Sequence, residues 1–448
     1  IKQRLFFTLV GNRLSRFTRG RIQSLDDFYE SGILLRLAIA MKSKVKHIVG
    51  LDIGTSFVRV AVVEQGISGN LRLLGLGEVP SRGLRKGVVI NIEATVSAIS
   101  EAIEQAETMA GVHVSSVFAS ISGAHLRGFS SNGIVGIRGK EVTLHDIEKV
   151  MEAAKAVAIP SDREVLHVMP QEFIIDDQDG IREPVGMAGV RLEARVHMVT
   201  GAIASAQNVV KCANRCGLTV KDIIASTLSA GSAVVATEEQ ELGVCLIDIG
   251  GGTTDICVYQ GGSVRHTGVI SVGGGHITND IAAGLRTPIA AAEKIKCEHG
   301  SATKIGAIDH ETVEVASTGG RPPRVLSRLV LSEIIEPRVS EILELVKEDL
   351  KNAGVDDCIA SGIILTGGTA NLAGIETLAE SVFELPVRIG TPHCLVGMKE
   401  MIEHPEYATV VGLTLHGART AAITPFMENK GVVRGVLNRV SRFFVEHF

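Results

Sequence analysis

Tryptophan is absent from this 448-residue chain, and aromatic residues make up only 4% of it. A protein that grips bases or sugars mainly by stacking them on rings is therefore disfavoured. The formal net charge is −5, so the basic field of a typical nucleic-acid-binding protein is missing, and no nucleic-acid partner is expected. No run approaches the roughly 18 uninterrupted apolar residues that a membrane-spanning helix needs.

Patterns for disulfides and metal sites are equally scarce. Seven cysteines are scattered along the chain and no signal peptide is apparent, which favours a reducing cytosol. Cys212 and Cys216 lie one helical turn apart without a further ligand pair, which is typical of buried small apolar residues rather than of a zinc site. The 14 histidines show no His-Glu-x-x-His spacing, so we propose no metal catalysis from them.

The residues that are present predict an α/β fold. Hydrophobic residues make up 45% and charged residues 21% of the chain, which is an ordinary globular composition. Apolar runs of strand length alternate with segments of helical period. We expect strand–turn–strand units at 48–63 and 244–259, and helices at 92–110, 144–157, 204–216, 281–299 and 329–353.

The two ends of the chain differ from its middle. Residues 1–43 carry many arginines, and regular strand alternation starts only at Val45. Because Met41 is followed by Lys-Ser-Lys, we expect 1–40 to be upstream sequence within an N-terminal extension of 1–43, with a short basic membrane arm as the alternative. Residues 421–434 contain Pro425 and Gly431 and show little period, which predicts a linker before an amphipathic tail at 435–448.

A weak internal duplication links the two strand–turn–strand units. Each has an apolar strand, an aspartate, a turn of glycine and hydroxyl residues, and a second strand. The residues concerned are Asp52, Gly54, Thr55 and Ser56 in the first unit, and Asp248, Gly250, Gly251, Gly252, Thr253 and Thr254 in the second. No helix follows either turn directly, which excludes a dinucleotide fingerprint, and no Gly-x4-Gly-Lys-Ser/Thr loop is present.

The two turns have the chemistry of a triphosphate site. Glycine lets backbone N–H groups approach phosphate oxygens without a Cβ in the way, and the hydroxyls add donors. A carboxylate beside phosphate repels it unless a cation lies between, so Asp52 and Asp248 imply Mg²⁺ held largely through water. One such hairpin alone would be an ordinary turn, but two copies and a third turn favour a clamped nucleotide. In that third turn, Gly367, Gly368 and Thr369 would lie against adenosine and the α-phosphate at a helix start.

In their order and spacing, the three turns resemble the phosphate 1, phosphate 2 and adenosine motifs of the actin/Hsp70/sugar-kinase superfamily. In that comparison Glu293 and Lys296 look like the helix that packs on adenine and ribose, and a surface helix with an i,i+3 ion pair is the alternative. Four more specific segments, 165–173, 180–187, 319–324 and 335–338, resemble the FtsA family of bacterial cell-division proteins. This resemblance runs from about Lys44 to the C-terminus.

The resemblance implies an actin-like ATPase fold of two lobes with duplicated phosphate-binding hairpins, an extra small α+β subdomain and a C-terminal amphipathic helix. The expected subdomains are 1A (44–122, 203–232 and 395–420), 1C (123–202), 2A (233–275 and 345–394) and 2B (276–344). The resemblance also implies ATP and Mg²⁺ as cofactors, and attachment of FtsZ filaments to the cytoplasmic face of the inner membrane at the division septum. Recruitment of later division proteins is implied as well. Self-assembly into filaments would follow from the actin-like architecture, whereas no general base for ATP hydrolysis can be identified from the residues.

Two further groups of residues are expected to bind partners. Arg321, Arg324, Arg328 and Arg338 gather in the segment that the resemblance places in the FtsZ-contacting subdomain, where they would suit an acidic FtsZ tail; a solvated basic face is the alternative. The C-terminal tail has an apolar stripe beside arginines at helical spacing, which predicts a helix lying in the interface of an anionic membrane; docking on the protein's own core is the alternative. Its membrane-binding residues are Leu437, Arg439, Val440, Arg442, Phe443, Phe444 and Phe448.

Two other functions stay open. A metabolite kinase on the same fold would need a catalytic aspartate beside a sugar pocket, and the low aromatic content and the amphipathic tail disfavour it. An actin-like pilus-assembly protein would share the extra subdomain. The 319–324 segment and the tail favour the FtsA family over it.

Overall fold

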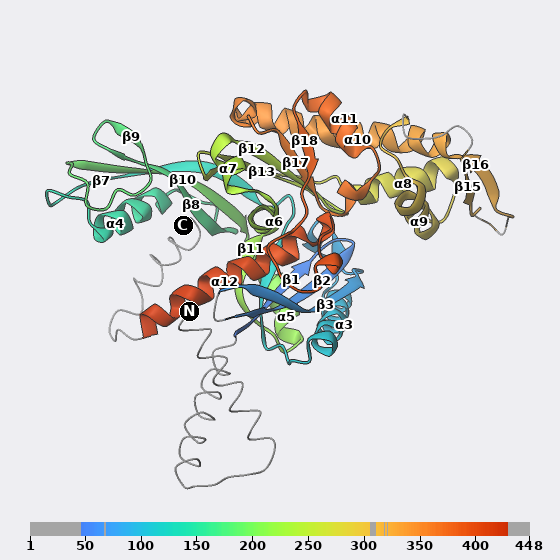
Figure 1. The fold of residues 1–448 in the computed structure, drawn as a ribbon, viewed down its shortest axis with the longest axis horizontal. Coiled ribbons are helices and arrows are strands. Elements are labelled where there is room, and N and C mark those ends of the chain that lie inside the picture. Colours follow the sequence, from blue (N-terminus) through green and yellow to red (C-terminus); the bar gives the residue numbers. More distant parts are fainter. Residues whose placement is uncertain (1–45, 67–68, 305–310, 318, 320, 429–448) are drawn as a thin grey trace, which may run out of the picture. The chain divides into compact units, whose positions relative to one another are not determined.

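The computed structural model describes residues 46–66, 69–304, 311–317, 319 and 321–428 (Figure 1). Apart from residues 46–47 and 65–70, this part of the chain forms one compact unit. The expected N-terminal extension at 1–43 and the amphipathic tail at 435–448 lie outside the described residues. Within the described residues, no helix is both long and apolar enough to cross a bilayer.

The first lobe is built on a five-stranded sheet in the order β11-β6-β1-β2-β3. Its strands are β1 (Lys46–Ile53), β2 (Phe57–Gln65), β3 (Leu71–Pro80), β6 (Ser116–Ile121) and β11 (Thr219–Ala225). The helices α3 (Ile92–Ala110) and α5 (Ile203–Arg215) share one apolar cluster with this sheet. Asn91 caps α3 and Gly111 ends it in the left-handed conformation, so its bounds match the expected 92–110.

The second lobe repeats this arrangement in the order β14-β13-β12-β17-β18. Its strands are β12 (Val244–Ile249), β13 (Thr254–Gln260), β14 (Ser263–Ile270), β17 (Ile363–Thr366) and β18 (Val387–Ile389). In both sheets a three-strand meander is extended on one side by two strands, and β6 and β17 pair in parallel with the first strand of their meander. The duplication inferred from the two turns therefore extends to the whole sheets.

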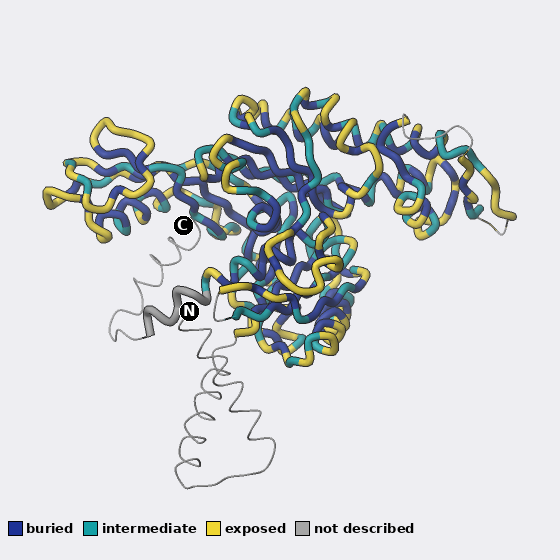
Figure 2. The backbone as a smooth tube through the Cα atoms, viewed as in Figure 1, coloured by how far each residue is buried: buried dark blue, intermediate teal, exposed yellow. Residues whose placement is uncertain are grey.

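Helices fill the space between and beside the sheets. The helices α6 (Ser226–Val234) and α12 (Ala408–Glu428) share an apolar cluster with residues of both sheets, among them Ala61 and Leu246. The second sheet is covered by α8 (Gly274–Leu285), α10 (Arg328–Ala353) and α11 (Ile375–Phe383). Its three central strands β13, β12 and β17 are buried along most of their length (Figure 2). Smaller elements complete this part: α7 (Thr237–Leu242), α9 (Ile289–His299), β15 (Thr312–Val315), β16 (Arg324–Ser327), β4 (Leu84–Arg85) and β5 (Val88–Val89).

A separate small sheet is inserted between β6 and α5, in the order β7-β10-β8-β9. It consists of β7 (Arg127–Gly136), β8 (Arg163–Ile175), β9 (Gln178–Ile181) and β10 (Arg191–Ala202), and α4 (Leu144–Lys155) covers one face. The sheet and helix bury their own apolar cluster, which includes Phe173 and Leu192. This gives the extra α+β subdomain that the resemblance implied.

Two expected elements differ in the structure. The segment 281–299 is not one helix: α8 ends at Leu285 and α9 begins at Ile289, because Pro288 cannot continue a helix ladder. Of the segment 421–434, for which we expect a linker, residues 421–428 continue α12, and residues 429–434 lie outside the described residues. Extending an existing helix needs no new nucleation. This advantage outweighs the weak helical periodicity of apolar residues after residue 420.

Candidate functional site

The two glycine turns lie against each other across one pocket. Gly54 N–H donates to the Phe57 carbonyl over 3.0 Å, and Gly250 N–H donates to the Thr253 carbonyl over 2.9 Å, so each hairpin is closed in the same way. The turns approach so closely that a Cβ on Gly251 would lie 1.9 Å from Ser56 Oγ, and one on Gly252 would lie 2.6 Å from Thr55 Oγ1. Glycine is required here because the second turn packs directly on the first.

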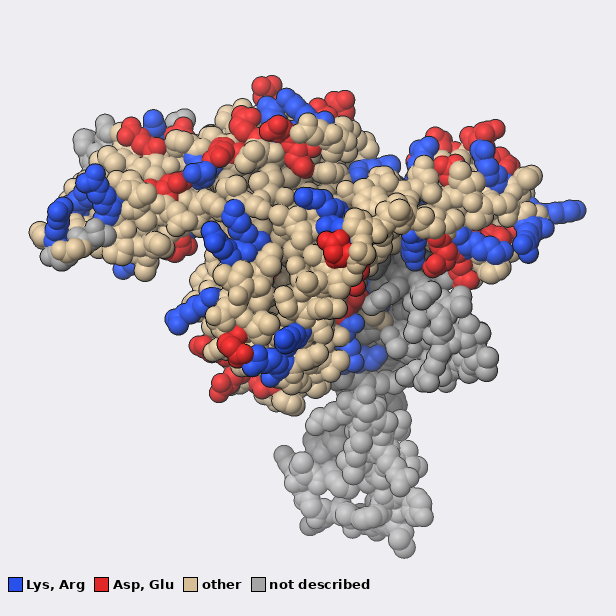
Figure 3. All heavy atoms as spheres, turned by 180° about the vertical axis from the view of Figure 1, so that it is seen from behind, with Lys and Arg blue, Asp and Glu red and all other residues tan. Residues whose placement is uncertain are grey.

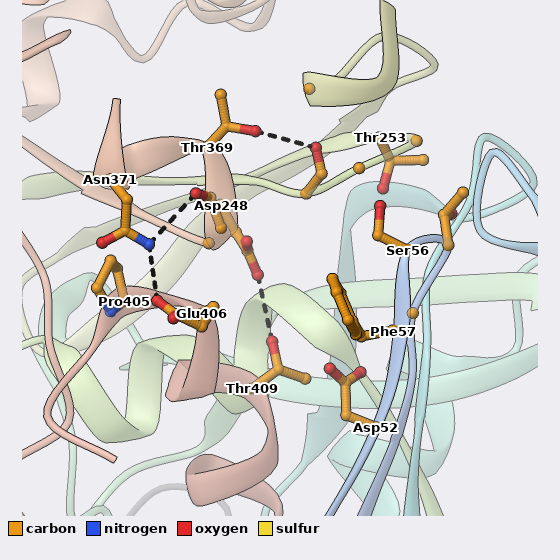
Figure 4. Close-up of a pocket in the computed structure, with 18 of the residues that line it drawn as sticks. Asp52, Ser56, Phe57, Asp248, Thr253, Thr369, Asn371, Pro405, Glu406 and Thr409 are labelled. Carbon is orange, nitrogen blue, oxygen red and sulfur yellow. Dashed lines mark hydrogen bonds between the residues drawn. The ribbon is translucent and has the colours of Figure 1, made fainter. Parts of the chain in front are cut away.

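A cavity of about 420 Å³ opens at this junction (Figure 4). It is lined by both hairpin turns, by the third turn and by α9. The expected site residues that line it are Asp52, Gly54, Thr55, Ser56, Asp248, Gly250, Gly251, Gly252, Thr253, Glu293, Lys296, Gly367, Gly368 and Thr369. Thr254 is the exception: it is fully buried in β13, and its hydroxyl donates to the Val272 carbonyl over 2.9 Å.

Three buried carboxylates face this cavity, one more than expected. Asp52 accepts a hydrogen bond from Ser120 Oγ at 2.7 Å, and Asp248 accepts one from Thr409 Oγ1 at 3.2 Å. The third, Asp255, lies directly opposite Asp248 in the β12–β13 register and accepts from Ser122 Oγ at 2.8 Å. Cross-strand partners project to the same face of a sheet, so strand alternation after the turn could have identified Asp255.

The carboxylates hold their protons unusually tightly. Burial, reinforced by the nearby Asp255 and Asp52, raises the pKa of Asp248 to about 7. Burial likewise raises the pKa of Asp255 to about 6 and raises the pKa of Asp52 above its usual value. A cation would stabilise the ionised form of these clustered, buried carboxyl groups. Such a cluster is therefore suited to binding a cation.

The charge of the lining is strongly acidic, so a polyphosphate bound there would need a cation between it and the carboxylates. Among the described residues of the lining, six are acidic and two are basic, and both basic residues are already paired. Arg59 Nε lies 2.5 Å from Glu78 Oε2, and Lys296 Nζ lies 2.8 Å from Glu293 Oε2. In the described part of the chain, no group of three or more His, Cys, Asp or Glu side chains is arranged to hold a metal ion by itself. A hydrated Mg²⁺ shared with phosphate oxygens fits this donor set, because Mg²⁺ keeps several of its waters.

The residues expected to bind the nucleoside lie on α9 and at the third turn, and both segments line the cavity. Lys296 Nζ donates to Thr278 Oγ1 at 2.9 Å as well as to Glu293, so the i,i+3 pair of α9 is fixed to α8. Gly367 has a φ of 83°, a left-handed value that favours glycine, and it leads into the short 3-10 helix η3 (Gly368–Asn371). A Cβ added to Gly368 meets nothing nearer than 3.9 Å, so this position opens onto free space.

Several residues of the site were missed from the sequence. The glycines at the start of α8 hold the second turn: Gly274 and Gly275 N–H donate to the Gly250 and Gly251 carbonyls, each over 2.8 Å. Arg59 lies over the rings of Phe57 and Tyr407, at 5.1 and 5.2 Å from their centroids. The run of three glycines at the start of α8 could have been noticed in the sequence, but the contacts of Arg59 and Thr409 join distant segments and leave no local pattern.

The four arginines expected to bind a partner differ in their exposure and in their contacts. Arg321 is exposed, whereas Arg324 donates to the Leu285 carbonyl, and Arg328 donates to the His299 carbonyl and pairs with Glu311. Arg338 lies on α10 with Nε 2.5 Å from Asp280 Oδ2 of α8, and it also pairs with Glu341. On the face of the molecule shown in Figure 3, basic side chains likewise lie among acidic ones.

Comparisons with known proteins show the family of the chain. Residues 245–412 match the family model "Cell division protein FtsA", and residues 123–200 match "SHS2 domain inserted in FTSA". The cell division protein FtsA of Pseudomonas aeruginosa is 51% identical over 83% of this chain and 89% of its own length. That of Neisseria meningitidis is 43% identical over 91% of this chain and 100% of its own length.

Solved structures extend the likeness to the fold. A PilM–PilN type IV pilus biogenesis complex matches with a TM-score of 0.62 and 17% identity, covering 83% of this chain and 98% of that one. MreB5 of Spiroplasma citri bound to ADP matches with a TM-score of 0.51 and 17% identity, covering 86% of this chain and 99% of that one. At this identity the two structures support the actin-like fold alone. With relatives that are 51% and 43% identical over most of its length and both family models matched, the chain belongs to the FtsA family of bacterial cell-division proteins.

Proposed function

We propose that this chain binds ATP with Mg²⁺, assembles into filaments, and tethers FtsZ filaments to the cytoplasmic face of the inner membrane at the division septum. It would act there as a peripheral protein and help to recruit later division proteins. The observation that carries the proposal is the pocket, where two matching hairpins place Asp52 and Asp248 around one strongly acidic cavity. Membership of a cell-division family supports the cellular role.

The nucleotide would be held mainly by backbone and hydroxyl groups. Gly54–Ser56 and Gly250–Thr253 would bind the phosphates, while Gly367, Gly368 and Lys296 would bind the adenosine. Asp52 and Asp248 would hold the waters of Mg²⁺, which supplies the positive charge that the paired Arg59 and Lys296 do not. We propose ATP binding and assign no residue as a general base for its hydrolysis.

Calorimetric titration with ATP tests the pocket. We expect binding with Mg²⁺ and at least about tenfold weaker binding with EDTA, since a buried charge pairing of this kind is commonly worth more than about 1.4 kcal/mol. Asp248→Ala should remove most of the Mg²⁺ dependence. Asp179→Ala, at an exposed position of β9, is the matched control. Equal ATP affinity with Mg²⁺ and with EDTA would contradict the proposal.

Membrane attachment is assigned to the tail at 435–448, which lies outside the described residues. Its sequence places Phe443, Phe444 and Phe448 beside Arg439 and Arg442. A helix of 14 residues spans about 21 Å, less than the roughly 30 Å hydrocarbon core, so it would lie in the interface with arginines toward anionic headgroups. Phe444→Glu should release the protein from anionic liposomes in a sedimentation assay while ATP affinity stays unchanged. Undiminished pelleting of this variant would contradict the assignment.

The FtsZ contact is assigned to the surface around Arg321, Arg324, Arg328 and Arg338. Exposed Arg321 is the cleanest probe, because Arg338→Glu would also place a carboxylate against Asp280 and Glu341. We expect Arg321→Glu and Arg338→Glu to weaken binding of an FtsZ C-terminal tail peptide, measured by fluorescence anisotropy. Arg138→Glu, an exposed arginine of the inserted subdomain, is the control. Unchanged tail affinity in both variants would remove this surface from the proposal.

Filament contacts are assigned to the inserted subdomain at 123–202. It exposes Ile134, Val185 and Val190, of which Val190 is 75% accessible, and such apolar groups are typical of an interface. Deleting the subdomain should abolish filaments on lipid in electron micrographs. ATP titration and a thermal melt check that the two lobes remain folded. Filaments formed by the deleted protein would contradict the assignment.

A further inference from the structure

The inserted subdomain begins at a peptide that is part of the nucleotide pocket. β6 ends at Ile121, Ser122 lines the cavity, and the inserted domain starts at Gly123. The root of the insertion is therefore one residue away from groups that would surround the phosphates.

The side chain of Ser122 is held by the second glycine hairpin. Its Oγ lies 2.8 and 2.9 Å from the two carboxylate oxygens of Asp255 and 3.2 Å from Thr253 Oγ1. Thr253 Oγ1 also donates to Asp255 at 2.9 Å, so the three side chains form a closed network. A serine hydroxyl has a single proton to donate, so the position of Ser122 depends on how Asp255 and Thr253 are arranged.

The backbone of the same peptide packs on Gly87, which is hydrogen-bonded to the first glycine turn. A Cβ on Gly87 would lie 2.9 Å from the Ser122 carbonyl and from Gly123 N, so Gly87 packs directly on this peptide. Gly87 N–H donates to Thr55 Oγ1 of the first turn over 3.0 Å. The root of the insertion thus contacts the second turn through Ser122 and is linked to the first turn through Gly87. Gly123 has a φ of 126°, a conformation that favours glycine and that leaves the backbone free to turn into the insertion.

The inserted sheet also rests on the hairpin that carries Asp255. His197 of β10 lies with Nε2 2.9 Å from Thr267 Oγ1 of β14, and both side chains are buried. Thr267 pairs with Cys257 of β13, two residues beyond Asp255. The hairpin β13–β14 therefore lines the nucleotide pocket with Asp255 of β13 and contacts the inserted sheet through Thr267 of β14.

We propose that Ser122 is a positioning residue that couples nucleotide occupancy to the seating of the inserted subdomain on β13–β14. The inference rests on the proposed ATP site and adds a route from that site to the subdomain. Bound phosphates and a hydrated cation would fix the side chains of Thr253 and Asp255, and Ser122 would be fixed with them. The inserted sheet would have two arrangements, one with the contact of His197 with Thr267 formed and one with it broken. Nucleotide binding would favour the arrangement in which this contact is formed.

Hydrogen exchange of the full chain measures this coupling directly. We would compare β7 and β10 with and without MgATP in four proteins: wild type, Ser122→Ala, Ser122→Thr and Ser131→Ala. Ser122→Thr keeps the hydroxyl. Ser131→Ala removes a hydroxyl inside the inserted subdomain, where it donates to the Ala154 carbonyl at 2.8 Å, away from the pocket. Calorimetry on the same samples gives the ATP affinity of each variant.

We expect MgATP to slow exchange in β7 and β10 of the wild type by at least about fivefold, the lower end of typical couplings between sites. Compared at MgATP concentrations that saturate each variant, as set by the calorimetric affinities, Ser122→Ala should lose that slowing. Ser122→Thr and Ser131→Ala should keep it. A wild type that binds MgATP without slower exchange, or Ser122→Ala with the full response, would overturn the coupling. A wild type that binds no MgATP would instead overturn the proposed ATP site.

Discussion

Replacing Asp248 with asparagine should stabilise the nucleotide-free protein while removing its response to Mg²⁺ and ATP. Burial, together with the nearby Asp255 and Asp52 carboxylates, raises the pKa of Asp248 from 3.8 to about 7. The negative charge is therefore harder to form in the folded chain than in the unfolded chain. Asparagine removes this charge and keeps an oxygen to accept the hydrogen bond from Thr409 Oγ1.

The size of the effect depends on pH in a definite direction. Below pH 3.8 the Asp248 carboxyl is protonated in both states and adds no penalty. Between pH 3.8 and about 7 the unfolded chain loses this proton while the folded chain keeps it, so the free energy of unfolding falls as pH rises. Above pH 7 both states are ionised and the loss is complete. At about 1.36 kcal/mol for each pKa unit, the full penalty is about 4 kcal/mol.

Urea unfolding of the metal-free protein at pH 5 and pH 8 checks this. We expect Asp248→Asn to gain about 2 kcal/mol over wild type at pH 5 and about 4 kcal/mol at pH 8. Asp179→Asn, at an exposed position of β9, should stay within about 0.5 kcal/mol of wild type at both pH values. MgATP should stabilise the wild type and leave the variant unchanged. The reasoning is refuted by an equal gain at both pH values, or by no gain at pH 8.

Three further outcomes are expected. Gly368→Asp should abolish ATP binding in calorimetry with an unchanged thermal melt, because the added side chain meets open pocket space, whereas Gly136→Asp, equally open on β7, should bind normally. Ile247→Ala, in the fully buried middle of β12, should lower the free energy of unfolding by about 2–5 kcal/mol in urea. Burial, with a smaller effect of His266, lowers the pKa of His197 to about 4. Unfolded His197 takes up a proton below about pH 6.5, so acidification to pH 4 should cost the wild type about 3 kcal/mol in urea titrations that His197→Gln does not lose.

Much of the site could be predicted because its chemistry is local in the chain. An aspartate at the end of a buried strand, followed by glycine and hydroxyl residues, encodes the turn whatever surrounds it, as at Asp52 and Asp248. The helix over 92–110 was likewise predictable, because Asn91 and Gly111 mark its two ends. The repetition of the turn then indicated one site built from two lobes, and the equivalent strand orders of the two sheets agree with it.

Errors arose where a local pattern competes with a long-range one. Thr254 looked like a phosphate donor because it follows the glycine turn, but β13 starts there, and alternation turns its hydroxyl to Val272. Asp255, one residue further, faces the pocket instead. The first part of the linker expected at 421–434 is helical instead, because α12 is already formed when the chain reaches residue 421.

The sequence by itself determined the two hairpins, the third turn and the family, because each depends on residues that are neighbours in the chain. Only the tertiary structure decided how the pocket is charged and what it is connected to. Thr409 reaches Asp248 across 161 positions, and Ser122 reaches Asp255 across 133. Such contacts form when separate elements pack on a shared core, and the two partners carry no joint pattern along the chain. The raised pKa values, the internally paired arginines and the link from the pocket to the inserted sheet all arise from that packing.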